Sequence, residues 1–325
     1  MVELNGKKIL VTFLMHLGDL TLTTPFIHAL RKAAPDAHIT MLVDEKLKDV
    51  VLFNPYLDEV VTIDKKGRDN SILSLWACSR HLSKLDFDVL INLHPNERCS
   101  FIDAMTSVKL RTGTTHKIFK WFWDVFTPLD RSMHAADMYL DVLQQLGVQD
   151  LSNNGLEIFP GEEHFLEAEL FWQEQNITDQ DKLIGFNIGS AVPTKRWPPE
   201  RFAEVADIFA AKGYKTVFFG GPMDEEMVAE ATGYMQTRPI IATGHFAIGG
   251  LAAAMRRCCL IITNDSGPMH VAISQKVPIV AMYGPSNPKL YGPYTKDAVI
   301  VTAQPPCQGC ADGMKHSCDD LQCMS

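Results

Sequence analysis

The sequence predicts an α/β protein made of two doubly wound domains, each a parallel sheet covered by helices on both faces. Short apolar runs rich in Val, Ile and Phe alternate with longer amphipathic stretches, which is typical of βαβ units around a buried sheet. This rhythm stops at a polar stretch, 147–163, and then restarts. A chain of 325 residues is long enough for two domains with one core each. We therefore expect domains at 1–155 and 156–325.

Apolar runs of strand length occur in both halves of the chain. In the first half they lie near 8–14, 38–43, 58–63, 86–93 and 109–112, and the clearest helical periodicity lies at 20–33, 71–84 and 134–146. In the second half they lie at 183–188, 215–220, 239–242, 260–263, 278–284 and 298–301, with helices near 161–176, 200–212, 224–236, 248–256 and 268–275. Domains joined by such a linker are expected to leave a cleft between the carboxyl ends of their sheets, where these folds bind ligands.

The composition indicates a soluble globular protein, with 46% hydrophobic and 21% charged residues. A formal net charge of −9 argues against nucleic-acid binding, because a phosphate backbone requires a basic face. No run approaches the roughly 20 apolar residues of a membrane-spanning helix. The apolar N-terminal segment follows Glu3 and ends at Gly18-Asp19. It reads as a first strand rather than a signal peptide, so we expect a cytoplasmic protein.

The stretch "ITNDSGPMH" joins a buried strand to a helix through small polar residues. A helix N-terminus offers unpaired N–H groups and the positive end of the helix dipole, so such a turn suits an anion. Asp265 or Ser266 can cap the helix. Gly267 lets a ligand approach the backbone, and Pro268 fits the first turn. The stretch alone is equally consistent with an ordinary capped turn, in which His270 binds no ligand.

Two more turns follow strands of the same predicted sheet. In "NIGSAVPTKRWPP", Lys195 and Arg196 come after a strand end at Ser190-Ala191, so these cations are candidates to neutralise a diphosphate. In "FFGGPMDEE", a Gly-Gly-Pro turn that includes Met223 can accommodate a nucleoside. Each turn alone also fits a solvated loop. A doubly wound sheet brings all three to one edge, although they match neither the dinucleotide nor the P-loop fingerprint.

The first strand ends at "MHLGD", which contains Asp19. A carboxylate at a strand end can face the cleft and act as a general base. It can equally cap the helix that follows, and spacing alone favours the cap.

Four stretches together resemble glycosyltransferase family 9, the heptosyltransferases of lipopolysaccharide inner-core assembly. They are, in order, "GDLTLTTPFIHALR", "PTKRWPPERFAEVA", "FFGGPMDEE" and "NDSGPMHVAISQKVPIVAMYGPSNP". The resemblance covers nearly the whole chain and implies a GT-B fold, with an N-terminal acceptor domain and a C-terminal nucleotide-sugar domain facing a central cleft. It also implies transfer of a heptose from an ADP-activated donor to a sugar hydroxyl, with inversion and without a metal or other cofactor.

The resemblance assigns roles to individual residues. Asp19 matches the catalytic aspartate, and Lys195 matches the lysine that contacts the donor's phosphates. Asp265 matches the acidic residue that holds the heptose. The other donor-binding residues that it implies are Ser190, Ala191, Met223, Phe246, Ser266, Gly267 and His270. Ala191 stands where relatives often have a hydroxyl group.

Two stretches of the first domain are assigned to the acceptor. Asn96 and Arg98 in "NLHPNERCS" suit acidic core sugars or a lipid phosphate. In "HKIFKWFWDVF", Lys117 and Lys120 alternate with aromatic residues, which suits a membrane interface. The aromatic residues can equally belong to the core, with the lysines solvated. The expected partners are a nucleotide-sugar donor, a lipid-linked core oligosaccharide and the cytoplasmic face of the inner membrane.

The C-terminal tail contains four cysteines with the spacing C-x2-C-x7-C-x4-C, namely Cys307, Cys310, Cys318 and Cys323. Thiols this close in sequence can bind structural zinc, form disulfides or stay reduced. Two other functions fit the same pattern of domains. A nucleotide-sugar epimerase would convert its donor without an acceptor. A non-catalytic nucleotide-sugar binding protein would not need both Asp19 and Lys195.

Overall fold

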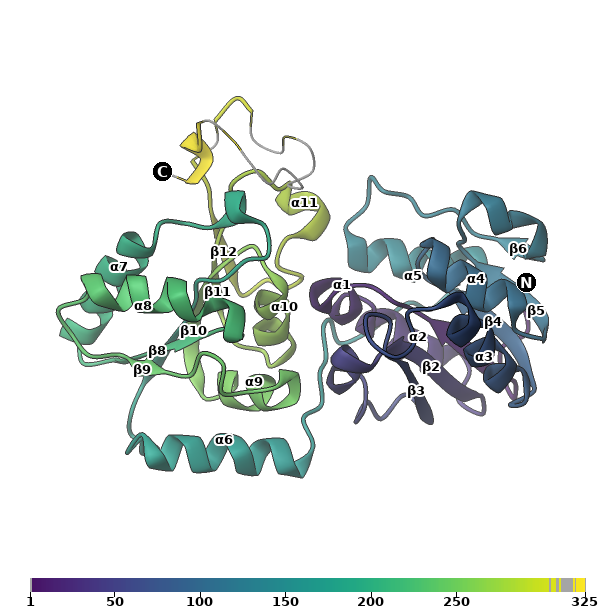
Figure 1. Ribbon diagram of the computed structural model, residues 1–325, viewed down its shortest axis with the longest axis horizontal. Helices are drawn as coiled ribbons and strands as arrows, with labels where there is room; N and C mark the ends of the chain where they lie inside the picture. The colour runs from purple at the N-terminus through teal and green to yellow at the C-terminus, as the bar shows by residue number, and fades with distance from the viewer. Residues whose placement is uncertain (1, 304, 308–309, 311–317, 319, 325) are drawn as a thin grey trace. The chain divides into compact units, whose positions relative to one another are not determined.

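The computed structural model describes residues 2–303, 305–307, 310, 318 and 320–324 (Figure 1). The chain divides into two compact units, unit 1 at Met1–Gly155 and unit 2 at Leu156–Ser325. Each unit contains one six-stranded sheet. All neighbouring strands of both sheets run parallel, which confirms the predicted fold class of two doubly wound sheets.

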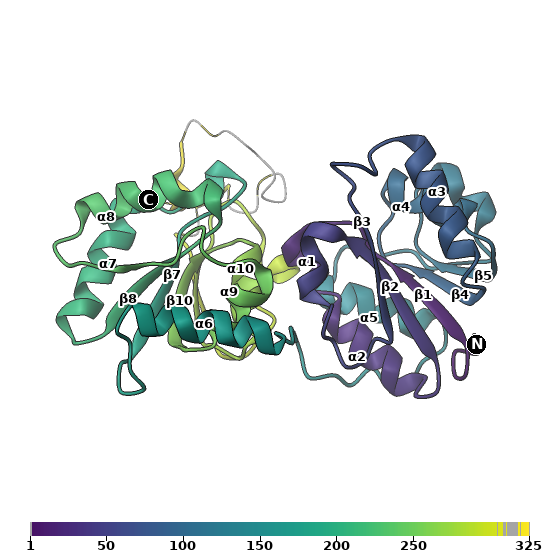
Figure 2. The same cartoon turned by 60° about the horizontal axis from the view of Figure 1, so that its bottom comes forward.

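Unit 1 has the strand order β3-β2-β1-β4-β5-β6. Its elements are β1 (Lys8–Thr12), α1 (Leu17–Thr21), α2 (Thr24–Ala33), β2 (His38–Asp44), η1 (Glu45–Val50), β3 (Glu59–Ile63), α3 (Ile72–Ser83), β4 (Phe87–Asn92), α4 (Glu97–Met105), β5 (Val108–Gly113), η2 (Lys117–Phe122), β6 (Val125–Phe126) and α5 (Ala135–Gln145). Helix α2 packs beside α5 and α3 packs beside α4, on opposite faces of the sheet (Figure 2). The central strands are apolar along their length because helices cover both faces.

The helix predicted at 20–33 is interrupted in the structure. A short helix, α1, ends at Thr21, and α2 begins at Thr24. Pro25 is the second residue of α2 and has no N–H to donate to the preceding turn, so the helix restarts there. The predicted cap at Asp19 is wrong, because His16 is the N-cap of α1 and Asp19 lies in its first turn.

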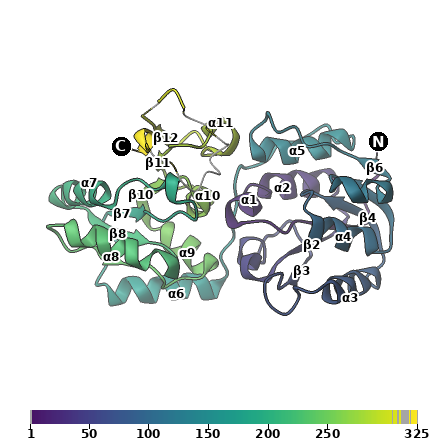
Figure 3. The same ribbon diagram turned by 45° about the horizontal axis from the view of Figure 1, so that its top comes forward.

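Unit 2 has the strand order β12-β11-β10-β7-β8-β9. Its elements are α6 (Glu162–Glu174), β7 (Leu183–Asn187), η3 (Pro193–Lys195), α7 (Pro199–Ala211), β8 (Lys215–Phe219), η4 (Pro222–Asp224), α8 (Glu225–Tyr234), β9 (Ile240–Ile241), α9 (Ile248–Met255), β10 (Cys258–Asn264), α10 (Gly267–Ser274), β11 (Ile279–Met282), α11 (Pro288–Tyr291), β12 (Ala298–Val301) and η6 (Gln322–Met324). Helix α7 packs beside α8, and α9 packs beside α6 and α10 (Figure 3).

The two sheets share one topology. In each, the first strand of the unit pairs with the second on one side and with the fourth on the other. The chain therefore winds away from the centre in both directions, and the loops that follow the two central strands diverge. Ligands of doubly wound sheets bind at this switch point, outside the carboxyl ends of the strands. In unit 1 the switch point lies between β1 and β4, and in unit 2 it lies between β7 and β10.

Candidate functional site

Three loops converge on one carboxylate at the switch point of unit 2. Asp265 follows β10 and Lys195 lies in the loop after β7, and the Lys195 Nζ lies 2.8 Å from the Asp265 Oδ2. The Ser286 hydroxyl, from the loop after β11, donates to the same carboxylate oxygen. The side chains of Lys195 and Asp265 are only 17% and 6% exposed. The ion pair is therefore shielded from bulk water, which strengthens it relative to a surface pair.

Two buried asparagines hold these loops in place. Asn187 ends β7, and its Nδ2 donates to the Ser266 Oγ over 2.9 Å. Asn264 ends β10, where its Oδ1 accepts from the Trp197 N–H and its Nδ2 donates to the Ile188 carbonyl. Both amides are buried, so their partners are needed to offset the loss of water. Each asparagine links the loop after β7 to the loop after β10.

The start of α10 has no side-chain cap among the described residues. Ser266 is the N-cap residue in an extended conformation, but its hydroxyl makes no capping hydrogen bond. Asp265 is paired with Lys195 instead. Ser266 therefore occupies the predicted N-cap position, but neither Ser266 nor Asp265 forms the predicted side-chain capping hydrogen bond. The positive end of α10 begins at Gly267, directly after the Lys195–Asp265 pair, which is an arrangement that suits an anionic ligand.

The loop after β8 meets the same edge of the sheet. A Cβ atom on Gly189 would lie 2.2 Å from the Asp224 Oδ1, so any larger residue there would displace the Asp224 carboxylate. The Asp224 carboxylate also accepts a hydrogen bond from the Gly221 N–H, which closes the Gly-Gly-Pro turn. The three turns singled out in the sequence thus lie together at one edge of the sheet.

The remaining predicted donor residues have different environments. Ser190 is buried, and its hydroxyl oxygen accepts from the Val192 N–H, whereas Ala191 is exposed. Met223 is 83% exposed. Phe246 packs edge-on against Phe171, with 5.0 Å between ring centroids.

His270 is 4% exposed and lies within α10. It lies in the first turn of that helix, which begins with Gly267.

Sequence reasoning missed Asn187, Asn264 and Ser286. A signal for the two asparagines exists, because each ends a buried and mostly apolar strand, and a polar residue in a buried strand requires a partner. The sequence carries no signal for Ser286, because its role depends on β11 lying beside β10.

In unit 1, Asp19 lies near the carboxyl edge of the sheet, in the first turn of α1. Its side chain is 26% exposed, and its Oδ2 lies 3.6 Å from the His16 Nδ1. His94 follows β4, the neighbour of β1, and its ring packs edge-on against Phe13. Burial lowers the pKa of His94 to about 4, and the nearby Asp19 carboxylate opposes this shift only in part. His94 is therefore a neutral imidazole at physiological pH.

The predicted acceptor residues Asn96 and Arg98 are engaged in contacts within unit 1. The Asn96 Oδ1 caps α4 by accepting from the Cys99 N–H. The Arg98 guanidinium donates to the Lys65 carbonyl and to the Asn70 side chain. Both side chains thus brace loops at the carboxyl edge of the sheet.

The aromatic segment 116–126 divides between surface and core. Trp121 is 95% exposed, whereas Trp123 is 8% exposed and donates its Nε1–H to the Thr112 carbonyl. Ile118 and Phe122 also face outward, and both predicted lysines are exposed. The Lys120 ammonium lies 4.3 Å from the centroid of the Phe126 ring. No helix in the described part of the chain is long and apolar enough to cross a membrane.

The cysteine-rich tail is described only in part, because 308–309, 311–317 and 319 lie outside the described residues. The eight cysteines are free thiols. No group of three or more His, Cys, Asp or Glu side chains is arranged to hold a metal ion within the described ranges. Cys323 and Met324 are buried against the loop after β11, since a Cβ atom on Gly284 would lie 2.3 Å from the Met324 Sδ.

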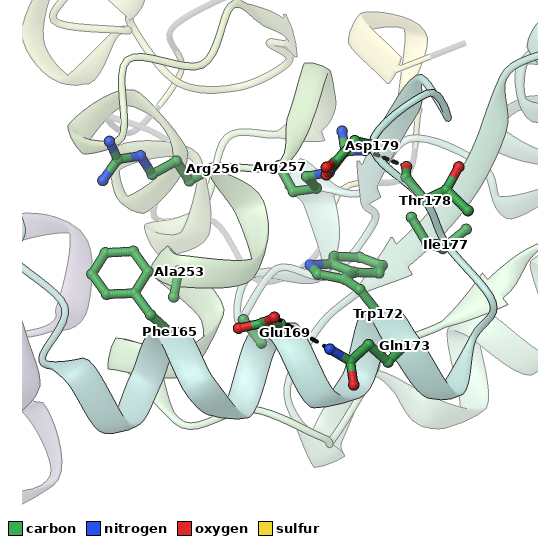
Figure 4. A pocket seen from close by; sticks show the side chains of 11 residues that line it. Phe165, Glu169, Trp172, Gln173, Ile177, Thr178, Asp179, Ala253, Arg256 and Arg257 are labelled. Atoms are coloured by element: carbon green, nitrogen blue, oxygen red, sulfur yellow. Dashed lines mark hydrogen bonds between the residues drawn. The ribbon is translucent and has the colours of Figure 1, made fainter.

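A separate pocket of about 760 Å³ lies in unit 2 between α6 and the end of α9 (Figure 4). Arg256 and Arg257 on one wall precede β10, and Thr178 on another precedes β7. The pocket therefore lies at the amino edge of the sheet, opposite the Lys195–Asp265 pair.

Comparisons with known proteins agree with this geometry. Residues 75–318 match the family model described as glycosyltransferase family 9 (heptosyltransferase). The crystal structure of a family 9 glycosyl transferase from Veillonella parvula DSM 2008 is 58% identical, with a TM-score of 0.91, over 92% of this chain and 88% of that chain. The structure of Escherichia coli ADP-heptose lps heptosyltransferase II is 22% identical, with a TM-score of 0.76, over 91% and 90%.

A curated relative also matches along most of its length. Lipopolysaccharide heptosyltransferase 3 of Escherichia coli (strain K12) is 24% identical over 297 residues, which is 87% of this chain and 84% of that protein. Because the family model covers well over half of the sequence, the chain belongs to glycosyltransferase family 9, the heptosyltransferase family, and is a glycosyltransferase with the GT-B fold.

Proposed function

We propose that the enzyme transfers a heptose from an ADP-activated donor to a sugar hydroxyl of a lipopolysaccharide inner-core acceptor, with inversion at the anomeric carbon. The observation that carries the proposal is the convergence of Lys195, Asp265 and Ser286 beside the start of α10. The name of the Escherichia coli structure, an ADP-heptose lps heptosyltransferase, supports this choice of donor.

The leaving diphosphate gains negative charge as the glycosidic bond breaks. The Lys195 ammonium and the first N–H groups of α10 are preorganised to stabilise that charge. Asp265 keeps the Lys195 charge compensated before the donor binds. Its carboxylate can then accept hydrogen bonds from hydroxyl groups of the heptose, while Ser286 holds the carboxylate in place.

The acceptor hydroxyl must lose a proton as it attacks. In this proposal Asp19 is the general base, since its carboxylate is partly exposed in the first turn of α1. A single displacement by this hydroxyl inverts the anomeric carbon. The neutral imidazole of His94 lies near Asp19 without competing as a charged group.

Two variants test the proposed roles. Asp19→Asn should lower kcat for transfer more than 100-fold, because general-base catalysis contributes about 10²–10⁴-fold, while ADP-heptose binding stays unchanged. Asp265→Asn should instead weaken ADP-heptose binding, measured by calorimetry. Wild-type kcat in Asp19→Asn would contradict the base assignment. Binding of a uridine or guanosine sugar in place of ADP-heptose would contradict the donor, and donor conversion without an acceptor would indicate an epimerase.

Transfer in this proposal does not require a divalent metal, because the Lys195 ammonium and the α10 dipole supply the positive charge. We expect full activity in excess EDTA. Loss of activity on chelation, restored by Mg²⁺ or Mn²⁺, would show that this part of the proposal is wrong.

The acceptor would be reached at the cytoplasmic face of the inner membrane, through the outward-facing side chains of η2. Ile118, Trp121 and Phe122 are exposed next to the cationic Lys117 and Lys120. Exposed aromatic side chains beside lysines favour an anionic bilayer interface.

We expect Trp121→Ala to lower sedimentation with vesicles of anionic phospholipid several-fold, since a large apolar side chain no longer enters the interface. Trp76→Ala is the matched control, because Trp76 is also exposed in unit 1 but lies on α3. Equal sedimentation of Trp121→Ala and wild type would contradict the assignment of this surface.

A further inference from the structure

Lys65 lies in the segment after β3 and reaches the loop that connects β1 to α1. Its Nζ donates to the carbonyl oxygens of Leu14 over 3.1 Å and Met15 over 3.2 Å. The same ammonium lies 3.0 Å from the Asp44 Oδ2, at the end of β2. The side chains of Lys65 and Asp44 are 15% and 7% exposed. The ammonium therefore donates two hydrogen bonds to the carbonyls and forms an ion pair with the Asp44 carboxylate.

The two carbonyls belong to a short stretch of backbone that has left the sheet. The Phe13 N–H still donates to the Leu42 carbonyl of β2. Helix α1 begins only at Leu17, and Asp19 lies in its first turn. The direction in which the chain leaves β1 therefore sets the position of the Asp19 carboxylate. Lys65 contacts the chain at this exit.

Lys65 is itself fixed by neighbouring elements. Its backbone carbonyl accepts from the Arg98 guanidinium, which also donates to the Asn70 side chain. The other oxygen of the Asp44 carboxylate accepts from the Lys46 N–H. Lys65, Asp44 and Arg98 together form a clamp. This clamp connects the ends of β2 and β3, and helix α4, to the loop after β1.

We infer that Lys65 is a positioning residue that holds the loop preceding Asp19 through the Leu14 and Met15 carbonyls. The inference rests on the proposed function, in which Asp19 takes the acceptor proton. A displacement of about 1 Å in a reacting group can cost on the order of 100-fold in rate. The donor-binding residues belong to unit 2, so the clamp should affect turnover rather than donor affinity.

Two variants separate the positioning role of Lys65 from a role of its ion pair in stability. Asp44→Asn removes the charge next to Lys65 but leaves both carbonyl contacts. The double variant Asp44→Asn with Lys65→Met removes the carbonyl contacts without leaving a buried carboxylate unpaired. Lys66→Met is the matched control, since Lys66 is the next residue and is exposed.

Transfer from ADP-heptose to a core acceptor is then measured for each variant. We expect kcat of the double variant to fall about 10- to 100-fold below that of Asp44→Asn, with the KM for ADP-heptose within about 2-fold of wild type. Lys65→Arg in the presence of wild-type Asp44 keeps the charge and the N–H donors, so its kcat should stay close to that of the wild type. Equal kcat in Asp44→Asn and the double variant, or a kcat of Lys65→Arg as low as that of the double variant, would overturn the inference.

Amide hydrogen exchange supplies a readout that does not depend on transfer. The Leu20 N–H donates to the carbonyl of His16, the N-cap residue of α1, and the Leu22 N–H donates to the Gly18 carbonyl in its first turn. Their exchange should become at least about 10-fold faster in the double variant than in Asp44→Asn, and unchanged in Lys66→Met. Unchanged exchange in the double variant would overturn the clamp. Absence of heptose transfer by the wild type would overturn the proposed function. The exchange measurement would still show whether Lys65 holds the loop before α1.

Discussion

Asp103 of α4 supports a sharp prediction on the pH dependence of stability. Its side chain is fully buried in unit 1, and its Oδ2 accepts from the Thr12 Oγ1 over 2.8 Å and from the Asn92 Nδ2 over 2.5 Å. Thr12 and Asn92 are register partners at the ends of β1 and β4. The Asp103 Oδ1 has no hydrogen-bond partner within the described residues. Burial raises the pKa of this carboxyl from 3.8 to about 7, although the hydrogen bonds oppose the shift.

The sign of the effect follows from proton binding. Between pH 3.8 and about 7 the folded state keeps a proton on Asp103 that the unfolded chain has released. The contribution of Asp103 to the free energy of unfolding therefore falls as the pH rises through this window and is level above it. A difference of about 3 pKa units corresponds to about 4 kcal/mol, of which about 2 to 3 kcal/mol falls between pH 5 and pH 8.

The variant Asp103→Asn removes this titration. An asparagine keeps one carbonyl oxygen to accept from Thr12 and Asn92, and it cannot ionise. Its amide N–H groups take the place of the unpartnered oxygen, which costs about 1 to 3 kcal/mol at every pH. We therefore expect the variant to lose less stability than the wild type between pH 5 and pH 8, by about 2 to 3 kcal/mol.

Urea unfolding at pH 5, 6, 7 and 8 measures this difference. Unfolding is followed by tryptophan fluorescence in a background in which the other four tryptophans are replaced by phenylalanine. The signal then reports on unit 1, because the Trp123 indole is buried and hydrogen-bonded there. Asp88→Asn is the control. Hydrogen bonding from Lys109 lowers the pKa of Asp88, so its titration lies below pH 5 and the slope above pH 5 should not change. Equal slopes for Asp103→Asn and wild type would refute the reasoning.

Two further predictions concern unit 2. Ser286→Ala removes a hydrogen bond to the Asp265 carboxylate, so we expect the KM for ADP-heptose to rise about 10-fold, with little change in Tm; an unchanged KM would exclude a role for this hydroxyl. Gly284→Val places a Cβ atom 2.3 Å from the Met324 Sδ and so should displace the end of the tail. Alkylation of the buried Cys323, followed by peptide mass spectrometry, should become faster, and an unchanged rate would contradict this packing.

The sequence predicts the sheets well because the strands are buried on both faces. Apolar runs such as "LIGFNI" and "LIIT" coincide with β7 and β10, and the turns that follow them lie at the carboxyl edge. The single helix predicted at 20–33 shows the limit of this reasoning, since the periodicity continues across Pro25 but the hydrogen bonding does not. The resemblance to the family, carried by four ordered motifs, also came from sequence alone.

The sequence pattern does not predict which side chains of the irregular segment 116–126 face the core. Trp121 and Trp123 are two residues apart and chemically identical, yet one is 95% exposed and the other 8% exposed. The aromatic side chains of the segment 116–126 are therefore divided between surface and core, and the membrane-interface role stays a prediction. The burial of Trp123 depends on the Thr112 carbonyl of β5, which the Trp123 indole reaches only in the folded unit.

The sequence by itself determined where strands end, which small or charged residues follow them, and which family the chain resembles, because these features are local. The tertiary structure decided which of those residues meet. Lys195 and Asp265 are 70 positions apart, and their contact exists because β7 lies beside β10. Ser286 joins them because β11 lies on the other side of β10. Strand order is a property of the whole sheet, so no local pattern could have specified this cluster.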